Sequence, residues 1–362
     1  MDTFPNDNPT TTVVVKPNRR DRACEAIKHY IRSHRLPPGE LLPPVRAISE
    51  HFEVSRDAAW RALRELETEG WVRARANRRY EISEEVYSRI LRSIKVKVLF
   101  TGRNYIHFTG NRRLADALRR ECAYHNIELS ISLLPMNAKP DPSVWEDCEI
   151  LMIDSGSSRE VLTHCPEFKV PVIGLDAEYS DRYHLNIVTD HNLGGRMVAE
   201  RLIQKGSNRV RIVHFEKSPA RIHARIEGFR QVWLESGKEE SHLMVRTIPW
   251  TANNFEVALN VQRELQDFDG DSDFFITDGK LAVTYLDMLD HLKFSVPEKI
   301  RLVGYDSSQM GGLTTPPMTT IQQDMDRIAE MAVARLPEVA RPHEGLTELV
   351  RIPPILVERI SG

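Results

Sequence analysis

Apolar residues recur at helical spacing along the first eighty positions of the chain. Residues 19–34 carry them three and four positions apart, which predicts a helix, and the turn-forming sequence Leu36-Pro37-Pro38-Gly39 follows. Residues 43–52 repeat the spacing after two prolines, which suit a first helical turn. A third helix is expected to begin after Ser55, whose hydroxyl suits an N-cap, and to end at Gly70.

The pattern then changes to two short runs that are typical of strands. Residues 71–75 and 80–82 flank a basic tip at residues 76–79. Two helices joined by a tight turn and followed by such a ribbon indicate a winged helix-turn-helix, a small α+β unit. We therefore expect a DNA-binding domain over residues 19–82.

From residue 96 to residue 362, short apolar runs alternate with stretches of helical spacing. The expected strands are 96–100, 127–133, 150–153, 170–175, 210–214, 243–248, 274–277 and 300–305, and the expected helices are 111–125, 192–205, 224–236, 253–266 and 280–292. Such alternation predicts parallel sheets covered by helices on both faces. The length exceeds what one doubly wound sheet needs, so we expect two α/β lobes with a ligand cleft beyond the carboxyl ends of the strands.

Two other segments complete the expected organisation. Residues 1–18 are rich in Pro, Asn, Asp and Thr, lack the pattern of a secretory signal, and are expected to form a disordered arm. Residues 83–95 are expected to be a linker that contains a short capped helix at residues 83–91.

Composition narrows the class of protein further. With 41% hydrophobic and 28% charged residues the chain is typical of soluble globular proteins, and no apolar run approaches the roughly 20 residues of a membrane helix. The four cysteines are scattered without metal-ligand spacing, which favours reduced, buried thiols. We therefore expect a cytoplasmic protein with no membrane partner, no metal and no cofactor.

The charge is distributed unevenly along the chain. Residues 18–97 carry a net charge of +6, and the residues from 98 onward carry −8. A basic segment ahead of an acidic one is what a phosphate-binding surface requires, although many solvated helices are equally charged.

The first domain resembles the GntR family of winged-helix repressors. The motifs that carry the resemblance are Leu36 to Pro43, Val45 to Ser49, Val54-Ser55-Arg56 and Ala62 to Gly70. The resemblance implies that the N-terminal end of the third helix enters the major groove while flanking arginines bind bases or phosphates. The residues it implies for DNA contact are Arg46, Ser55, Arg56 and Arg61, with Arg75, Arg78 and Arg79 in the wing.

The sequence departs from that family in two places. Ala58-Ala59-Trp60 stands where the family usually has Thr-Val-Arg, and the wing lacks its usual glycines. The arginines of the wing are candidates to compensate through the minor groove or the backbone. For each single arginine the alternative is a solvated surface charge.

The larger region is similar to the sensor domain of the LacI family, itself like the periplasmic sugar-binding proteins. The motifs are residues 170–176, 188–196, 224–229, 296–306, 316–321 and 356–359. The resemblance implies a pocket at the strand ends, in which several acceptors around one guanidinium suit sugar hydroxyls. The implied pocket residues are Asp154, Asp176, Arg225, Trp250, Asp278, Asp306 and Gln323, with Arg103, Tyr105 and Phe108 in the loop after the first strand.

Several of these residues have a purely structural alternative. Trp250 is either a stacking platform for a sugar or a core tryptophan beside Pro249. Asp190 is expected to cap the helix that follows it rather than to contact a ligand. Gly194-Gly195 lacks the full dinucleotide pattern, so close packing against the sheet is the favoured interpretation.

The two resemblances together predict a one-component transcriptional regulator of the repressor type that acts as a homodimer on a two-fold operator and binds a monosaccharide or a derivative in its cleft. The competing class is an enzyme on the same two-lobed fold. The sequence has no nucleophile elbow, no zinc-protease motif and no P-loop, and we expect no catalytic residues.

Overall fold

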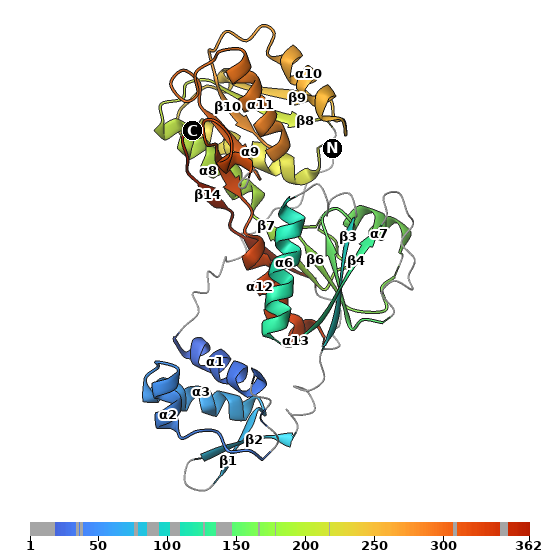
Figure 1. Cartoon of the computed structure of the whole chain (residues 1–362), viewed down its shortest axis with the longest axis vertical. Coiled ribbons are helices and arrows are strands. Elements are labelled where there is room, and N and C mark those ends of the chain that lie inside the picture. Colours follow the sequence, from blue (N-terminus) through green and yellow to red (C-terminus); the bar gives the residue numbers. More distant parts are fainter. Residues whose placement is uncertain are drawn as a thin grey trace, which may run out of the picture. The chain divides into compact units, whose positions relative to one another are not determined.

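The structure is a computed structural model of the whole chain. It describes residues 19–33, 36, 39–75, 79–84, 94–101, 109–125, 127–134, 147–165, 167–177, 179–216, 218–306, 310–340 and 347–362. The expected N-terminal arm and nearly all of the expected linker helix lie outside these residues. The chain divides into two compact units, residues 1–94 with 123–128 and residues 95–122 with 129–362 (Figure 1).

The first unit contains the elements that the sequence predicts for residues 19–82. Its elements are α1 (Arg19–Ser33), α2 (Val45–His51), α3 (Arg56–Thr68), β1 (Val72–Arg75) and β2 (Arg79–Ile82). The strands β1 and β2 pair in antiparallel fashion. Ile27, Leu63 and Ile82 are among the buried residues that join the helices to the ribbon in one core.

The two ends of α3 form as the sequence predicts. The hydroxyl of Ser55 accepts a hydrogen bond from the N–H of Ala58 at 3.1 Å, which satisfies one of the free donors of the first turn. At the other end, Gly70 has a φ of 79°, a left-handed conformation that favours glycine. The N–H of Trp71 then bonds back to the carbonyl of Leu66 at 2.7 Å.

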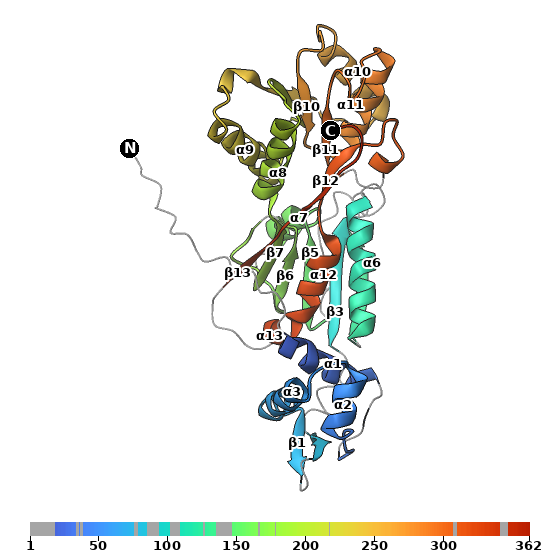
Figure 2. The same ribbon diagram turned by 90° about the vertical axis from the view of Figure 1, so that its left-hand side faces the viewer.

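The second unit is built on two six-stranded sheets, one in each lobe (Figure 2). The sheet of the first lobe has the order β13-β7-β6-β5-β3-β4. Its strands are β3 (Lys95–Thr101), β4 (Glu128–Leu134), β5 (Ile150–Asp154), β6 (Val172–Leu175), β7 (Leu185–Thr189) and β13 (Glu348–Ile352), and its helices are α6 (Thr109–Tyr124), α7 (Ser158–His164), α12 (Met325–Ala334) and α13 (Leu336–Val339).

The sheet of the second lobe has the order β14-β12-β11-β10-β8-β9. Its strands are β8 (Val210–Phe215), β9 (Leu243–Ile248), β10 (Asp273–Ile276), β11 (Leu302–Tyr305), β12 (Thr319–Gln322) and β14 (Ile355–Val357). Its helices are α8 (His191–Gln204), α9 (Ala220–Glu235), α10 (Asn254–Glu264) and α11 (Gly279–His291), with short 3-10 turns at Glu240–His242 and Met310–Gly312. One core lies against α8 and α9 and another against α10 and α11, so helices cover both faces of this sheet.

The expectation of wholly parallel sheets needs one correction. The edge strand β14 pairs with β12 in antiparallel fashion, whereas β12 is parallel to β11. The chain reaches β14 directly from β13 through Pro353 and Pro354, with no helix between them, so its direction in the second sheet is reversed.

Three segments cross between the lobes. They are the connections from β7 to α8, from β12 to α12 and from β13 to β14. The first and third are tied together, because the N–H of Asp190 donates to the carbonyl of Ile352 at 2.8 Å. The carboxylate of Asp190 also accepts from the N–H of Leu193 at 2.9 Å, which confirms its expected role as the cap of α8.

Two glycines allow α8 and α9 to approach unusually closely. A Cβ at Gly195 would lie 1.9 Å from the carbonyl oxygen of Arg225, and one at Gly228 would lie 2.0 Å from that of Asn192. Only Gly194 faces the sheet, through the side chain of Tyr305. The expected packing of the glycine pair against the sheet therefore holds for Gly194, while Gly195 packs against the backbone of α9.

We expect Gly195→Ala to lower the free energy of unfolding of the second unit by about 1–3 kcal/mol or more, because the added methyl group has no room against α9. The sign is informative, since alanine in an unobstructed helix interior would stabilise the protein by up to about 1 kcal/mol. Chemical denaturation of the two variants measures the difference. The control is Gly312→Ala, where the nearest atom to an added Cβ is 3.6 Å away; equal stability of Gly195→Ala and wild type would contradict the packing.

Candidate functional site

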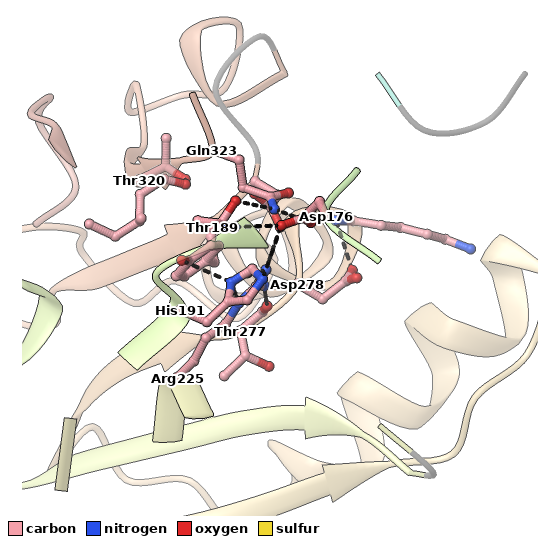
Figure 3. Close-up of polar contacts among 12 residues, drawn as sticks. Asp176, Thr189, His191, Arg225, Thr277, Asp278, Thr320 and Gln323 are labelled. Atoms are coloured by element: carbon pink, nitrogen blue, oxygen red, sulfur yellow. Dashed lines mark hydrogen bonds and ion pairs between the residues drawn. The ribbon is translucent and has the colours of Figure 1, made fainter. Parts of the chain in front are cut away.

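Polar side chains gather where the strands of the second unit end. Asp176 follows β6, Asp306 follows β11 and Gln323 follows β12. Together with Arg225 from α9, these expected pocket residues form one hydrogen-bonded network, which also contains His191 and Thr189 (Figure 3). The carboxyl ends of parallel strands are where such folds bind ligands.

The guanidinium of Arg225 is the centre of this network, although its residue is only 2% exposed. Its Nη1 donates to the carbonyl of Thr277 at 2.6 Å, and its Nη2 donates to Oδ2 of Asp306 at 2.9 Å. Its Cζ lies 3.5 Å from the ring centre of Tyr305. With these partners Arg225 orients Asp306, whose side chain is 31% exposed and is the better placed of the two to meet a ligand.

His191 belongs to the site, although the sequence analysis did not single it out. Nε and Nη2 of Arg225 both lie 3.3 Å from its Nδ1. Since a guanidinium has only donors, we assign the lone pair to Nδ1 and the proton to Nε2, which lies 3.5 Å from Oδ1 of Asp176. Its signals in the sequence were its place after the capping residue Asp190 and inside the motif of residues 188–196, neither of which assigns it a role.

Asp176 joins this network to two of the lobe crossovers. Its Oδ1 accepts the N–H of Thr189 at 2.9 Å, and its Oδ2 accepts a hydrogen bond from Gln323. The amide of Gln323 also donates to the hydroxyl of Thr189 at 3.0 Å. Asp176 and Asp306 have φ angles of 50° and 61°, so the backbone takes the same uncommon left-handed turn after β6 and after β11.

Three of the other expected pocket residues have different surroundings. Asp154 is 1% exposed and accepts from Asn111, at 2.7 Å, and from the N–H groups of Gly156 and Ser157. Asp278 caps α11, accepting from the N–H groups that follow it. Trp250 is 53% exposed beyond β9, so the alternative of a core tryptophan is wrong.

The surroundings shift the pKa of several of these groups. Burial raises the pKa of Asp154 to about 6 against the effect of its hydrogen-bond donors. Burial also opposes the ionisation of Asp176, but His191, the N–H of Thr189 and the charge of Arg221 outweigh it and hold the pKa of this carboxyl below its usual range. Burial and the charge of Arg225 lower the pKa of His191, which agrees with a neutral ring.

The residues expected to contact DNA lie in the first unit, on exposed positions. Arg46 pairs with Glu50 at 2.9 Å, Arg61 pairs with Asp57 at 2.6 Å, and Arg75 pairs with Glu81 at 2.6 Å.

The remaining expected DNA contacts are less engaged with the protein. Among the described residues Arg56 takes part in no ion pair, so its guanidinium is available to a partner. Arg79 is exposed directly opposite Arg75 in the ribbon. Arg78, like Arg103, Tyr105 and Phe108, lies outside the described residues.

Two further searches of the described residues concern metals and membranes. Within that part of the chain, no three His, Cys, Asp or Glu side chains are grouped so that they could hold a metal ion. No helix there is long and apolar enough to cross a membrane.

Comparison with known proteins places each unit separately. Residues 19–82 match the family model of bacterial regulatory proteins of the gntR family, and residues 199–361 match that of a periplasmic binding protein-like domain. Among curated proteins, the ribose operon repressor of Escherichia coli K12 is 28% identical over 210 residues, 57% of this chain and 61% of that protein. The regulator CelR of Thermobifida fusca is 27% identical over 170 residues, 47% of this chain and 43% of that protein. The match to the ribose operon repressor thus spans about three fifths of that relative's length.

Solved structures show the same fold at lower identity. A LacI family transcriptional regulator from Enterococcus faecium with bound ribose has a TM-score of 0.61 at 19% identity, covering 74% of this chain and 98% of that one. A periplasmic binding protein/LacI transcriptional regulator from Alkaliphilus metalliredigens in complex with D-xylulofuranose has a TM-score of 0.60 at 17% identity, covering 74% and 99%. These structures confirm the two-lobed α/β fold.

The neutral state of His191 predicts a pH dependence of stability. In the folded protein its pKa is lowered, so it stays neutral as the pH falls, while in the unfolded chain it takes up a proton near pH 6.5. The unfolded state then binds more protons, and the stability of the second unit is expected to fall below about pH 6.5, by at most about 1.4 kcal/mol per pH unit.

The measurement compares unfolding midpoints of wild type and His191→Asn between pH 7.5 and pH 5.5. The raised pKa of Asp154 acts in the opposite direction near pH 6, since protonation there favours the folded state. The difference between the two proteins therefore isolates His191. His291→Asn, on the exposed end of α11, is the control; an equal slope in wild type and His191→Asn would show that the ring is not held neutral.

Proposed function

We propose that this chain, which joins a gntR-type winged helix to a periplasmic binding protein-like domain of the kind found in LacI-type regulators, is a transcriptional regulator. Its winged helix binds operator DNA, and a small sugar bound at the ends of the strands of the second unit changes that binding. The protein acts as a homodimer inside the cell. A two-fold symmetric operator has two half-sites, and each winged helix of the dimer binds one of them.

The observation that carries the proposal is the network around Arg225 and Asp176. It contains groups from the ends of β6, β11 and β12 together with the first residue of α8. A ligand that contacts Asp306 or Gln323 therefore contacts residues that also position the segments crossing between the lobes. Ligand binding at this place can favour one lobe arrangement over another, which is what a sensor requires.

The chemistry of the network suits a polyhydroxylated ligand. Carboxylates accept hydrogen bonds from hydroxyl groups, and the amide of Gln323 offers both a donor and an acceptor. The exposed indole of Trp250 offers an apolar face beyond the edge strand β9 of the same lobe. The relative from Enterococcus faecium binds ribose, and CelR has been solved in complex with cellobiose; these sugars are the first ligands to test.

The DNA contact centres on the N-terminal turn of α3. Its first residue Arg56 follows the capping Ser55 and keeps its guanidinium free of ion pairs among the described residues. An arginine in this position can bond bidentately to a guanine. Arg46 and Arg61 would exchange their surface ion pairs for phosphates, which costs little because exposed pairs contribute little.

We expect Arg56→Ala to weaken operator binding by about 1–3 kcal/mol if the side chain bonds to a base. The operator is first selected from random duplexes by the full-length protein, and fluorescence anisotropy at fixed salt then measures affinity. The control is Arg263→Ala, which removes an exposed arginine from α10 of the second unit. Unchanged affinity in Arg56→Ala, or the same loss in both variants, would remove Arg56 from the specific contact.

For the sensor we expect Asp306→Asn to weaken sugar binding by about 1.5–3 kcal/mol, the range of a hydrogen bond to a charged group, without changing the affinity of the sugar-free protein for DNA. Calorimetry with ribose, xylulose and cellobiose measures the first quantity, and the anisotropy titration measures the second. Asp267→Asn, an exposed aspartate after α10, is the control. If Asp306→Asn binds the sugars with wild-type affinity, the ligand site lies elsewhere.

A further inference from the structure

A surface hollow lies on the exposed side of α3, next to the arginine assigned to base contact. It is lined by Val45 from the first turn of α2 and by Arg56, Asp57 and Trp60 from α3. Trp60 is 42% exposed, whereas the residues that α3 contributes to the core of the unit are fully buried. The indole of Trp60 thus faces away from the core of the unit and borders the hollow.

The indole is held along the helix rather than projecting freely. The guanidinium of Arg64, one turn further on, lies 4.9 Å from the ring centre of Trp60. Positions 56, 60 and 64 are four residues apart and share one face of α3. This face therefore presents an arginine, an apolar ring and a second arginine in a row.

We propose that Trp60, together with Val45, reads a thymine through its 5-methyl group, next to the base pair that Arg56 contacts. The proposal rests on the proposed function, since it requires α3 to enter the major groove. There the thymine methyl group is the apolar feature that distinguishes one base edge from the others. A hollow with an indole and a valine side chain in its wall matches that group, and besides the two charged side chains at its rim its only hydrogen-bonding side-chain group is the indole N–H.

The charges at the rim favour a base edge over the backbone. The carboxylate of Asp57 borders the hollow, and a phosphate placed there would be repelled. Arg56, on the same rim, supplies a positive charge that attracts the DNA, so that its major groove lies against the hollow.

The spacing along the helix sets where the thymine lies. One helical turn places Trp60 roughly 6 Å from Arg56 along the axis, and successive base pairs are about 3.4 Å apart. The thymine is therefore expected one or two base pairs from the guanine bound by Arg56, once in each half-site of a two-fold operator.

The test replaces each thymine of the selected operator in turn by deoxyuridine. This removes the methyl group and leaves the hydrogen-bonding edge unchanged. With wild-type protein we expect one thymine per half-site, next to the guanine of Arg56, at which binding falls about fourfold, as the loss of one buried methyl group predicts. In Trp60→Ala the thymine and deoxyuridine operators should bind equally well.

The control is Leu41→Ala, which removes an apolar side chain of nearly the same exposure, 43%, from outside α3. It should keep the full preference for thymine. The proposal is overturned if no deoxyuridine substitution weakens binding of the wild-type protein, a measurement that needs no protein variant. It is also overturned if Trp60→Ala keeps the preference for thymine over deoxyuridine. Failure to select any duplex at all would instead overturn the proposed function.

Discussion

A positive charge enclosed by protein must be neutralised and must have its donors satisfied, and Arg225 imposes this requirement on the whole second unit. Its guanidinium needs the carbonyl after β10, the carboxylate after β11 and the lone pair of His191 at the start of α8. The donors of the guanidinium are satisfied only when all three partners are in place. The end of the second sheet is therefore a single arrangement rather than a set of independent loops.

The close approach of α8 and α9 follows from the same requirement. Arg225 on α9 reaches His191 on α8 because the two helix backbones almost touch at Gly195 and Gly228. A side chain at either glycine would separate the helices and leave the guanidinium without its third partner. Gly195 and Gly228 thus serve the polar network, although the pair Gly194-Gly195 could be mistaken in the sequence for part of a phosphate-binding loop.

The sequence predicts the regular elements well where they are amphipathic or buried. The strand expected at residues 243–248 has those bounds in the structure, and the third helix starts and ends at its expected caps. The strands β7, β12, β13 and β14 and the helices α7, α12 and α13 were not expected. Polar residues interrupt the short runs of β7, β12 and β13, and β14 has only three residues.

The site could be predicted only in part, and for a different reason. Its aspartates were located by resemblance to a family, whereas their partners depend on three-dimensional packing. No pattern along the chain shows that Asp154 is enclosed by Asn111 and two backbone N–H groups, or that a lone histidine lies between Asp176 and Arg225.

A ligand can change the balance between two lobe arrangements only through contacts that differ between them. Asp176 has such contacts, since it bonds to Gln323 on one crossover and faces His191 on another. A sugar hydroxyl that replaced one of these bonds would exchange about 1.5–3 kcal/mol, which is similar to the 1–3 kcal/mol that couples two sites in a typical allosteric protein. One exchanged hydrogen bond at Asp176 is therefore sufficient, in energy, to shift the balance between two lobe arrangements.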